Sequence, residues 1–363
     1  MKIEKPPRLA IIGCGATVEF TLIAALRRIR WLPSVLIDIS PKRIDLVARS
    51  MGRHTRVVRS SDWNLVAGEF DAALISLPRS LRGLTGISLL KKGKHLILEE
   101  PPARLDEYEE ILSAAAQSGV TASVALPRRH LLLSRWTKAL LKAETLGEIK
   151  GFVAHEGVPP NSDILSGFLP EFQSTRNSLL SAKANSLDLL LWWFGDFGSA
   201  EYYDDSEGGL EAESIIDCRL ASGGRGTIEF SRTRKMSNSV RIEGERGFLE
   251  VHLWKNIIFA GSPNALAFSH EGVQGHEMKA QFAIDLIAAE LDDFKKNISN
   301  GVKLGTSRYD GARSMKLINQ CLAARRQMTP PWESALIQTS DDDCDAQIFL
   351  CPRYVTRQYT FAK

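Results

Sequence analysis

Long apolar runs, an excess of one charge and a cysteine framework are all missing from this sequence of 363 residues. No apolar stretch reaches the roughly 20 residues that a membrane-spanning helix needs, and the N-terminus lacks the apolar core of a signal peptide. The 46 basic and 43 acidic side chains leave a formal net charge of +3, which gives no reason to expect nucleic acid or an anionic membrane as a partner. We therefore expect a cytoplasmic protein.

Cysteines and metal ligands are also too sparse to suggest a disulfide scaffold or a metal centre. The five cysteines are scattered and odd in number, which fits a reducing compartment better than a set of disulfides. Cys344 and Cys351 lie in or near an acidic run at residues 341–345, but this tail contains no histidine that would complete a metal site. We expect the run to be a solvated loop and predict no metal.

The first strong signal is a strand, a glycine turn and a helix within residues 8–30. Residues 9–12 are wholly apolar, as in a strand that is buried on both faces of a parallel sheet. Gly13 allows a tight turn, and Gly15 lets backbone N–H groups approach a pyrophosphate at the helix N-terminus. The third small position of this dinucleotide fingerprint is Val18, so we expect the helix to pack slightly differently.

A second apolar strand at residues 35–37 ends at Asp38, which strengthens the dinucleotide interpretation. A carboxylate there can accept hydrogen bonds from an adenosine ribose, and it repels a 2′-phosphate. The position favours NAD(H), while the neighbouring Lys42 and Arg43 leave NADP(H) open.

The rest of the chain shows two different patterns of predicted secondary structure. Up to residue 126, short apolar strands alternate with helices, which predicts right-handed βαβ units and a parallel sheet. Beyond it, a long helix over residues 177–194 is followed by several β-rich segments separated by glycine turns, which predicts a mostly antiparallel sheet. The predicted fold class is an α/β Rossmann domain at residues 1–126, then an α+β substrate and oligomerisation domain at 127–333, then a C-terminal extension at 334–363.

Segments in both halves resemble the Gfo/Idh/MocA oxidoreductases, over about residues 8–332. The matching segments are Gly13-Cys14-Gly15-Ala16 and residues 89–95, 187–195 and 241–247. Members of that family are NAD(P)-dependent enzymes that act mostly on sugars, inositols and sugar nucleotides. The resemblance implies that, besides the glycine turn and Asp38, the cofactor borders Ser76, Leu77, Pro78 and Glu99, with Glu99 near the nicotinamide ribose.

The catalytic positions depart from the family pattern. The family carries Glu-Lys-Pro after the fourth strand, and its lysine donates a hydrogen bond to the reacting hydroxyl. Here residues 99–101 read Glu-Glu-Pro, and Glu100 cannot donate unless it is protonated. The family's Asp, His and Asp positions on the long helix are Ser181, Asn185 and Asp188 here, so only the last acid is kept; the three share one helix face. An amide can orient a substrate but cannot act as a general base.

Other polar residues near these positions each have two possible roles. Lys183 projects about 200° away from Ser181 at helical spacing, so we expect it to face solvent or a partner. His155 is a candidate substrate contact, because one of His155 and Glu156 could reach the cleft; a sheet-surface role is the alternative. Arg128 and Arg129 follow the last Rossmann strand, where they either contact a substrate phosphate or carboxylate or form an ordinary basic loop.

The sequence leaves three functions open. The first is a working oxidoreductase on a sugar derivative, with Glu100, Asn185 and Asp188 as catalytic candidates and Ser181 as a substrate contact, or with a substrate that needs no acid or base. The second is a catalytically silent paralogue that binds NAD(H) or a sugar as a sensor or partner subunit. The third is an NAD-dependent lyase or hydrolase. The resemblance also implies a homodimer or homotetramer, or a hetero-oligomer with an active relative.

Overall fold

The computed structural model describes residues 6–51, 55–99, 105–157, 178–206, 210–253, 257–262, 265–270, 276–302 and 310–329. Met1–Gln327 form one compact unit, which contains two sheets. Residues 328–363 form a second unit, of which only the first two residues are described. The acidic run, Cys344 and Cys351 therefore lie outside the described residues, as does Glu100.

The first sheet confirms the predicted Rossmann fold. Its six strands are all parallel, in the order β3-β2-β1-β4-β5-β6. They are β1 (Leu9–Ile12), β2 (Val35–Ile37), β3 (Arg56–Val58), β4 (Ala72–Ile75), β5 (His95–Leu98) and β6 (Ala122–Val124). The strand order reverses between β1 and β4, and the crevice at such a switch point is where open α/β sheets bind their ligands.

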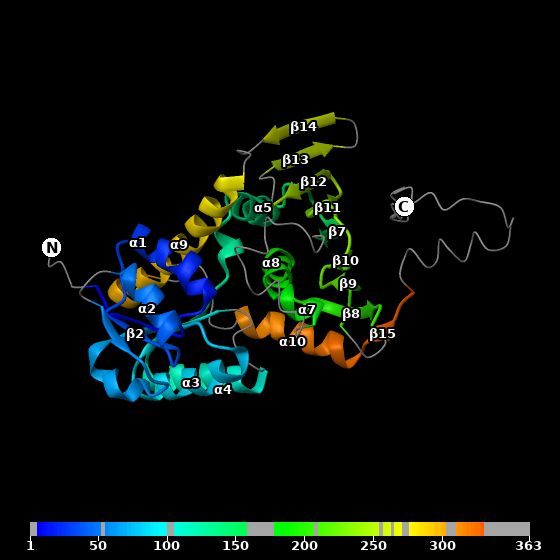
Figure 1. Cartoon of the computed structure of the whole chain (residues 1–363). Coiled ribbons are helices and arrows are strands. Elements are labelled where there is room, and N and C mark those ends of the chain that lie inside the picture. Colours follow the sequence, from blue (N-terminus) through cyan, green and yellow to red (C-terminus); the bar gives the residue numbers. More distant parts are fainter. Residues whose placement is uncertain are drawn as a thin grey trace, which may run out of the picture. The chain divides into compact units, whose positions relative to one another are not determined.

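Helices cover both faces of this sheet. They are α1 (Ile23–Arg28), α2 (Pro41–Arg49), the 3-10 helix η2 (Trp63–Glu69), α3 (Arg79–Lys91) and α4 (Leu105–Ser118). Successive β1 residues alternate between two cores, because strand side chains point to opposite faces. One core includes side chains of α3 and α4, and the other includes α1 and the long α9 (His276–Asn300), which returns from the C-terminal half to lie beside α1 (Figure 1).

The helix that was predicted after the glycine turn begins with a wider helical turn. Val18–Leu22 form a π-helical turn, η1, and α1 continues from it. Val18 is completely buried at the start of this turn, in the place where the dinucleotide fingerprint has a small residue. The expected difference in helix packing is thus a local change of helical type.

The second sheet is mixed and mostly antiparallel, as predicted. Its nine strands run in the order β14-β13-β12-β11-β7-β10-β9-β8-β15, and only the β7–β10 and β8–β15 pairs are parallel. The strands are β7 (Ile149–Gly157), β8 (Phe197–Asp204), β9 (Glu213–Leu220), β10 (Arg225–Ser231), β11 (Ser239–Gly244), β12 (Gly247–His252), β13 (Ile257–Ser262), β14 (Ala265–His270) and β15 (Arg326–Gln327). The sequence analysis missed β13 and β14, because residues 257–270 have no clear apolar–polar alternation.

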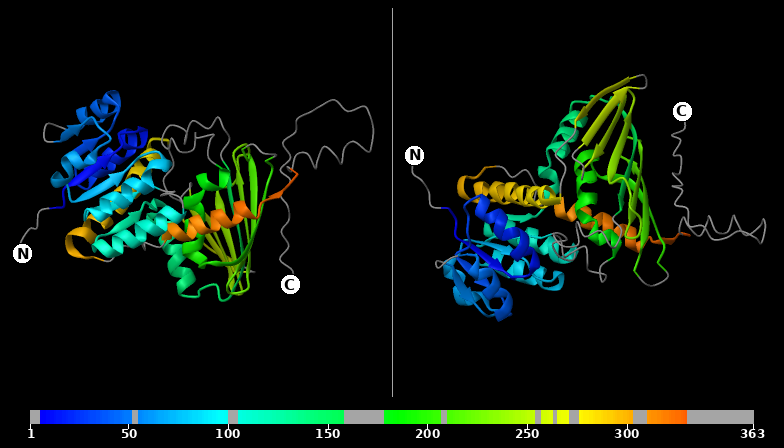
Figure 2. Two further views of the ribbon diagram at one scale, coloured as in Figure 1. Left: turned by 90° about the horizontal axis from the view of Figure 1, so that it is seen from below. Right: turned by 45° about the horizontal axis from the view of Figure 1, so that its top comes forward.

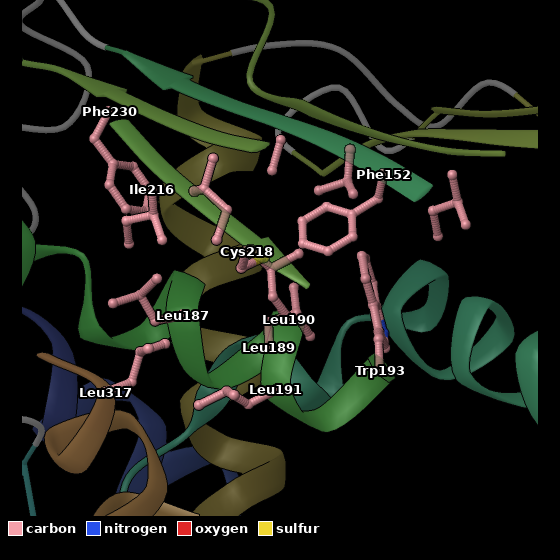
Figure 3. Close-up of a cluster of buried hydrophobic side chains, with 14 of the residues drawn as sticks. Phe152, Leu187, Leu189, Leu190, Leu191, Trp193, Ile216, Cys218, Phe230 and Leu317 are labelled. Atoms are coloured by element: carbon pink, nitrogen blue, oxygen red, sulfur yellow. The ribbon is translucent and has the colours of Figure 1, made fainter. Parts of the chain in front are cut away.

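Apart from α9, the described α-helices of this half pack on one face of the second sheet. They are α5 (Leu132–Lys142), α7 (Leu179–Ala182), α8 (Ala184–Phe194) and α10 (Asp310–Ala323); Figure 2 shows α10 in orange on the same side of the strands as the green helices. In Figure 3 the leucines of α8 meet Phe152, Ile216 and Phe230 of the strands. Phe152 is fully buried and stacks on Phe194, with ring centroids 4.4 Å apart.

The helix content does not indicate a membrane span. Among the helices that the structure describes, none is both long and apolar enough to cross a bilayer. The described part of the chain also holds no group of three His, Cys, Asp or Glu side chains with the geometry of a metal site.

Candidate dinucleotide and substrate site

The glycine turn after β1 has two glycines with different tasks. Gly13 has φ +94°, and a Cβ added to it would lie 2.2 Å from the carbonyl oxygen of Ser76. Gly13 is therefore required both for the turn and for its close approach to the end of β4. A Cβ added to Gly15 would meet no atom within 4 Å, so open space borders this backbone at the switch point. That arrangement fits a pyrophosphate next to Gly15 and the exposed Ala16.

Asp38 is tied to the same turn. One carboxylate oxygen accepts the Cys14 N–H at 2.6 Å, and the other accepts the Ser40 N–H at 2.7 Å. Each oxygen has further acceptor capacity, so the carboxylate can still receive ribose hydroxyls. Burial, followed by the charge of Asp38, raises the pKa of the Cys14 thiol to about 12, so this cysteine stays a protonated packing residue and is no nucleophile.

The ends of β4 and β5 are joined by a network around Glu99. Ser76 donates its hydroxyl to one Glu99 carboxylate oxygen at 2.9 Å. Arg82, from the first turn of α3, donates to the other oxygen at 2.8 Å, to the Glu99 carbonyl at 3.1 Å and to the Leu77 carbonyl at 2.6 Å. Burial raises the pKa of Glu99 although Arg82 and Ser76 oppose the shift. The predicted cofactor residues Ser76, Leu77 and Glu99 thus lie together, and Pro78 precedes α3 directly.

Arg82 was not predicted from the sequence. It is buried, with 7% of its surface exposed, and its contacts with Leu77 and Glu99 hold two of the predicted cofactor positions. A signal for it exists in the sequence, because a basic residue in the first turn after a buried strand can reach back to the strand end. The sequence alone did not say which carboxylate it would meet.

On the substrate side, the long helix is interrupted at Lys183. α7 ends at Ala182 and α8 begins at Ala184, with Lys183 between them at φ −104° and ψ 15°. The expectation that Lys183 faces solvent or a partner is wrong: it is 4% exposed and donates to Glu156 at 3.0 Å. The side of the helix opposite Ser181 faces the sheet, so a side chain pointing away from Ser181 is buried against β7 and β10.

Arg128 completes the cluster around Glu156. It lies in the 3-10 turn η3 (Pro127–His130) and makes two contacts of 2.9 Å with the two Glu156 oxygens. Ser186 of α8 donates to Glu156 and accepts from Arg128. Burial alone would raise the pKa of Glu156, but the charges of Arg128 and Lys183 hold it well below its usual range. Glu156 is thus a permanent carboxylate on the helix side of β7.

The neighbouring His155 points to the other face of the sheet. Its ring nitrogen lies 4.0 Å from a carboxylate oxygen of Glu229, its register partner on β10. Burial lowers the pKa of His155, with the charge of Glu229 opposing the shift. The structure therefore places this predicted substrate contact on the face of the sheet away from α8.

Arg129 and Asp188 meet in a buried cluster that ties three elements together. Arg129 makes two contacts with the Asp188 carboxylate, at 2.7 and 2.6 Å, and one with Asp310 of α10 at 2.7 Å. Arg129 is 5% exposed and Asp188 is 2% exposed. Arg129, which was predicted to contact a substrate, thus binds carboxylates of the chain itself. Asp188, a catalytic candidate, forms an ion pair with the Arg129 guanidinium.

The remaining predicted residues lie on the α7–α8 segment. Ser181 is buried and accepts the hydroxyl of Ser178 at 2.9 Å. Asn185 is half-buried, and its side-chain oxygen is enclosed without a hydrogen-bond partner among the described residues. An enclosed amide oxygen of this kind suits a ligand hydroxyl or amide as its donor.

A further buried carboxyl, Glu290, lies beside the Arg129 cluster. It comes from α9 and accepts the backbone N–H of Leu126 at the end of the Rossmann half. Burial raises the pKa of Glu290 to about 8, with Leu126 opposing and Asp188 reinforcing the shift. The sequence analysis missed Glu290, because a glutamate on an amphipathic helix ordinarily faces water.

An alanine substitution is expected to have different effects at Gly13 and at Gly15. Gly13→Ala should lower the melting temperature strongly, because its Cβ would collide with Ser76. Gly15→Ala should leave the melting temperature near that of the native protein but weaken NADH binding, since the methyl group enters the space next to the turn. Thermal melts and calorimetric titration measure both, with Gly68→Ala as a control whose Cβ also meets nothing within 4 Å. Unchanged NADH binding in Gly15→Ala would contradict the assignment.

Glu290 should make stability depend on pH. Its folded pKa of about 8 exceeds the ordinary value of 4.5, so its contribution is complete below about pH 4.5 and is lost as the pH rises through about 8. Glu290→Gln keeps the acceptor for Leu126 and removes the titration. The variant should therefore gain melting temperature relative to the native protein between pH 6 and pH 9 (roughly bracketing that pKa), whereas the exposed Glu110→Gln should not. If the melting temperatures of Glu290→Gln and the native protein change with pH in parallel, the titration of Glu290 does not affect stability.

Comparisons with known proteins agree with this geometry. Residues 7–126 match the model of the Gfo/Idh/MocA oxidoreductase family with its NAD-binding Rossmann fold. An oxidoreductase from Agrobacterium radiobacter, solved with NAD+, L-tartaric acid and magnesium, is 16% identical, with a TM-score of 0.75 over 88% of this chain and 96% of that one. UDP-N-acetylglucosamine 3-dehydrogenase from Acidithiobacillus ferrooxidans is 16% identical, with a TM-score of 0.72 over 89% and 98%.

A levoglucosan dehydrogenase solved with NADH and levoglucosan is 18% identical, with a TM-score of 0.71 over 88% of this chain and 97% of that chain. At these identities the solved structures establish a shared fold, which spans both sheets. The chain thus carries, in residues 7–126, the NAD-binding Rossmann fold of the Gfo/Idh/MocA oxidoreductase family.

Proposed function

We propose that the protein is an NAD(H)-dependent oxidoreductase that transfers a hydride between nicotinamide and a sugar-like or related small molecule. The observation that carries the proposal is the open space next to Gly15, bordered by a turn to which the Asp38 carboxylate is tied. Solved relatives of the same fold were obtained with NADH and levoglucosan, and with NADH and UDP-GlcNAcA. NADP(H) is the second candidate cofactor, because Lys42 and Arg43 adjoin Asp38 in sequence.

Each group in the site has a definable task in this reaction. Gly15 and Ala16 would hold the pyrophosphate, Asp38 would hold the adenosine ribose, and Glu99, fixed by Arg82, would receive the nicotinamide ribose. Bound NAD+ supplies the hydride acceptor. Asn185 would orient the reacting hydroxyl by accepting its hydrogen bond, as its enclosed oxygen allows.

The alternative is a catalytically silent paralogue that keeps cofactor or sugar binding. Two candidate catalytic side chains favour it, because neither is suited to act as a general base. Asp188 is neutralised by Arg129, and Asn185 is an amide that cannot accept a proton. A general base typically contributes about 10²–10⁴ in rate, so its loss would leave little activity on an alcohol substrate.

We also propose a homodimer or homotetramer, with a hetero-oligomer containing an active relative as the alternative. The face of the second sheet away from α8 carries charges in pairs, such as Arg241 with Glu243 at 2.6 Å and with Glu250 at 3.3 Å. Paired charges of this kind can be covered by a second copy at a lower desolvation cost than single ones.

Cofactor binding is the first test. Calorimetric titration of the full chain with NAD+, NADH, NADP+ and NADPH should give micromolar affinity for NADH and weaker affinity for the phosphorylated pair, because Asp38 repels a 2′-phosphate. Asp38→Asn removes the charge and keeps an acceptor oxygen. It should therefore reduce the difference in affinity between NAD(H) and NADP(H). If none of the four nucleotides binds, the Rossmann half is a scaffold and the proposed function is wrong.

Restoring the family's catalytic residues separates the active enzyme from the silent paralogue. The triple variant Glu100→Lys, Ser181→Asp, Asn185→His is compared with the native protein on a panel of sugars, inositols and aldonic and uronic acids, with NADH absorbance as the readout. Oxidation by the native protein supports the enzyme. Oxidation by the triple variant alone identifies the native protein as silent toward this chemistry.

A further inference from the structure

Arg129 of η3 contacts one face of α8 at two successive turns. Its two contacts with the Asp188 carboxylate measure 2.7 and 2.6 Å, and its guanidinium carbon lies 5.4 Å from the centroid of the Trp192 ring. Asp188 and Trp192 are four residues apart on α8, so they are neighbours on one face of the helix. A planar guanidinium that is attached at both turns resists rotation of the helix about its axis and sliding along it.

Asn185 lies on this face, one turn nearer to the start of α8. It precedes Asp188 by three residues, and residues at this spacing are neighbours on a helix surface. The interruption at Lys183 separates this first turn from α7, so the helical register of α7 does not carry over to Asn185. The direction of the Asn185 side chain is therefore set within α8, where the ion pair of Asp188 with Arg129 lies one turn away.

The preceding arginine supports the same turn from the other side. Arg128 donates to the Ser186 hydroxyl oxygen at 2.8 Å, and Ser186 directly follows Asn185 in the sequence. Ser186 and Asp188 are two residues apart and project about 200° from each other at helical spacing. The two arginines of η3 thus hold almost opposite sides of the turn that contains Asn185.

The turn η3 is itself attached to the strand end that carries Glu99. The Ala125 N–H donates to the Leu98 carbonyl at 2.8 Å, which continues the pairing of β5 with β6 past the end of β6. Leu98 directly precedes Glu99, and η3 begins shortly after Ala125. The amide proposed to orient the reacting hydroxyl is therefore held at a fixed place relative to the carboxylate proposed to receive the nicotinamide ribose.

We propose that Arg129 is a positioning residue, which sets the place of the Asn185 amide relative to Glu99 through its contact with Asp188. Asp188 then serves as the attachment point on the helix and not as a proton acceptor. The inference rests on the proposed function for the task of Asn185 in the reaction. The attachment of α8 to η3, and its effect on Asn185, can be measured without cofactor or substrate.

The test compares two carboxylates that bind the same arginine from different helices. Asp188→Ser removes the attachment to α8, whereas Asp310→Ser removes a partner of Arg129 on α10. Both variants should lower the melting temperature, because each leaves Arg129 with less compensation. Only Asp188→Ser should move the NMR signals of the Asn185 side-chain amide. These are recorded on full-length protein with isotope-labelled asparagine and are assigned through Asn185→Ala.

A kinetic readout applies to any sugar that the native protein oxidises. Asp188→Ser should lower kcat by about 10²-fold, the cost that a misplacement of about 1 Å can have. In the Asn185→Ala background the same substitution should cost much less, because the side chain that it misplaces is already absent. Asp310→Ser should have the same small effect in both backgrounds.

The NMR comparison decides the inference. Asn185 signals that stay in place in Asp188→Ser, or that move equally in Asp310→Ser, would overturn it. If Asp188→Ser does not fold, Arg129→Lys, which keeps the charge but loses the two-point contact, should move the same signals. NADH binding with unmoved Asn185 signals would refute this inference alone. Signals that move as expected in a protein that binds no nucleotide would refute the proposed function and leave the positioning of Asn185 by Arg129 standing.

Discussion

Two consecutive arginines between the sheets hold the architecture together. Arg129 binds Asp188 and Asp310, which joins η3 to α8 and α10, and Arg128 binds Glu156 on β7. Because η3 begins three residues after β6, these pairs connect the edge of the Rossmann sheet to both layers of the second sheet. Removing one partner of a buried ion pair typically costs about 3–5 kcal/mol, since the other charge is then left without compensation.

This arrangement separates the proposed cofactor site from the proposed substrate site. The dinucleotide side is built from backbone: Gly13, Gly15 and the Cys14 N–H define a turn against Ser76 and Asp38. The substrate side is built from side-chain charges buried between β7, η3 and α8. In the proposed function, cofactor binding would therefore persist through changes at the proposed catalytic positions, so the oxidoreductase and the silent paralogue would share the same first half.

The Rossmann half could be predicted almost completely, because its signals are local. Apolar strand runs, the glycine turn and the acid after the second strand are each recognised within a few residues, and right-handed βαβ connections predict a parallel sheet. The short edge strand β3 was missed, because only one of its three residues is buried. The second sheet was predicted in outline, but β13 and β14 were missed, and the division at residue 126 did not reveal that α9 packs beside α1. Residues 257–270 carry no alternation, and the partner of a helix face is a long-range property.

The sequence predicted which residue types the candidate site contains, but it did not predict most of the contacts between them. The sequence alone determined the glycine turn, the acid after β2 and the residue types at positions 100, 181 and 185, because each is a matter of residue type at a local spacing. Only the tertiary structure decided that Lys183 is buried, that Glu156 and not His155 faces the helices, and that Arg82 holds Glu99. The physical reason is that burial and ion pairing depend on which element covers a side chain, and helical or strand spacing contains no information on that neighbour.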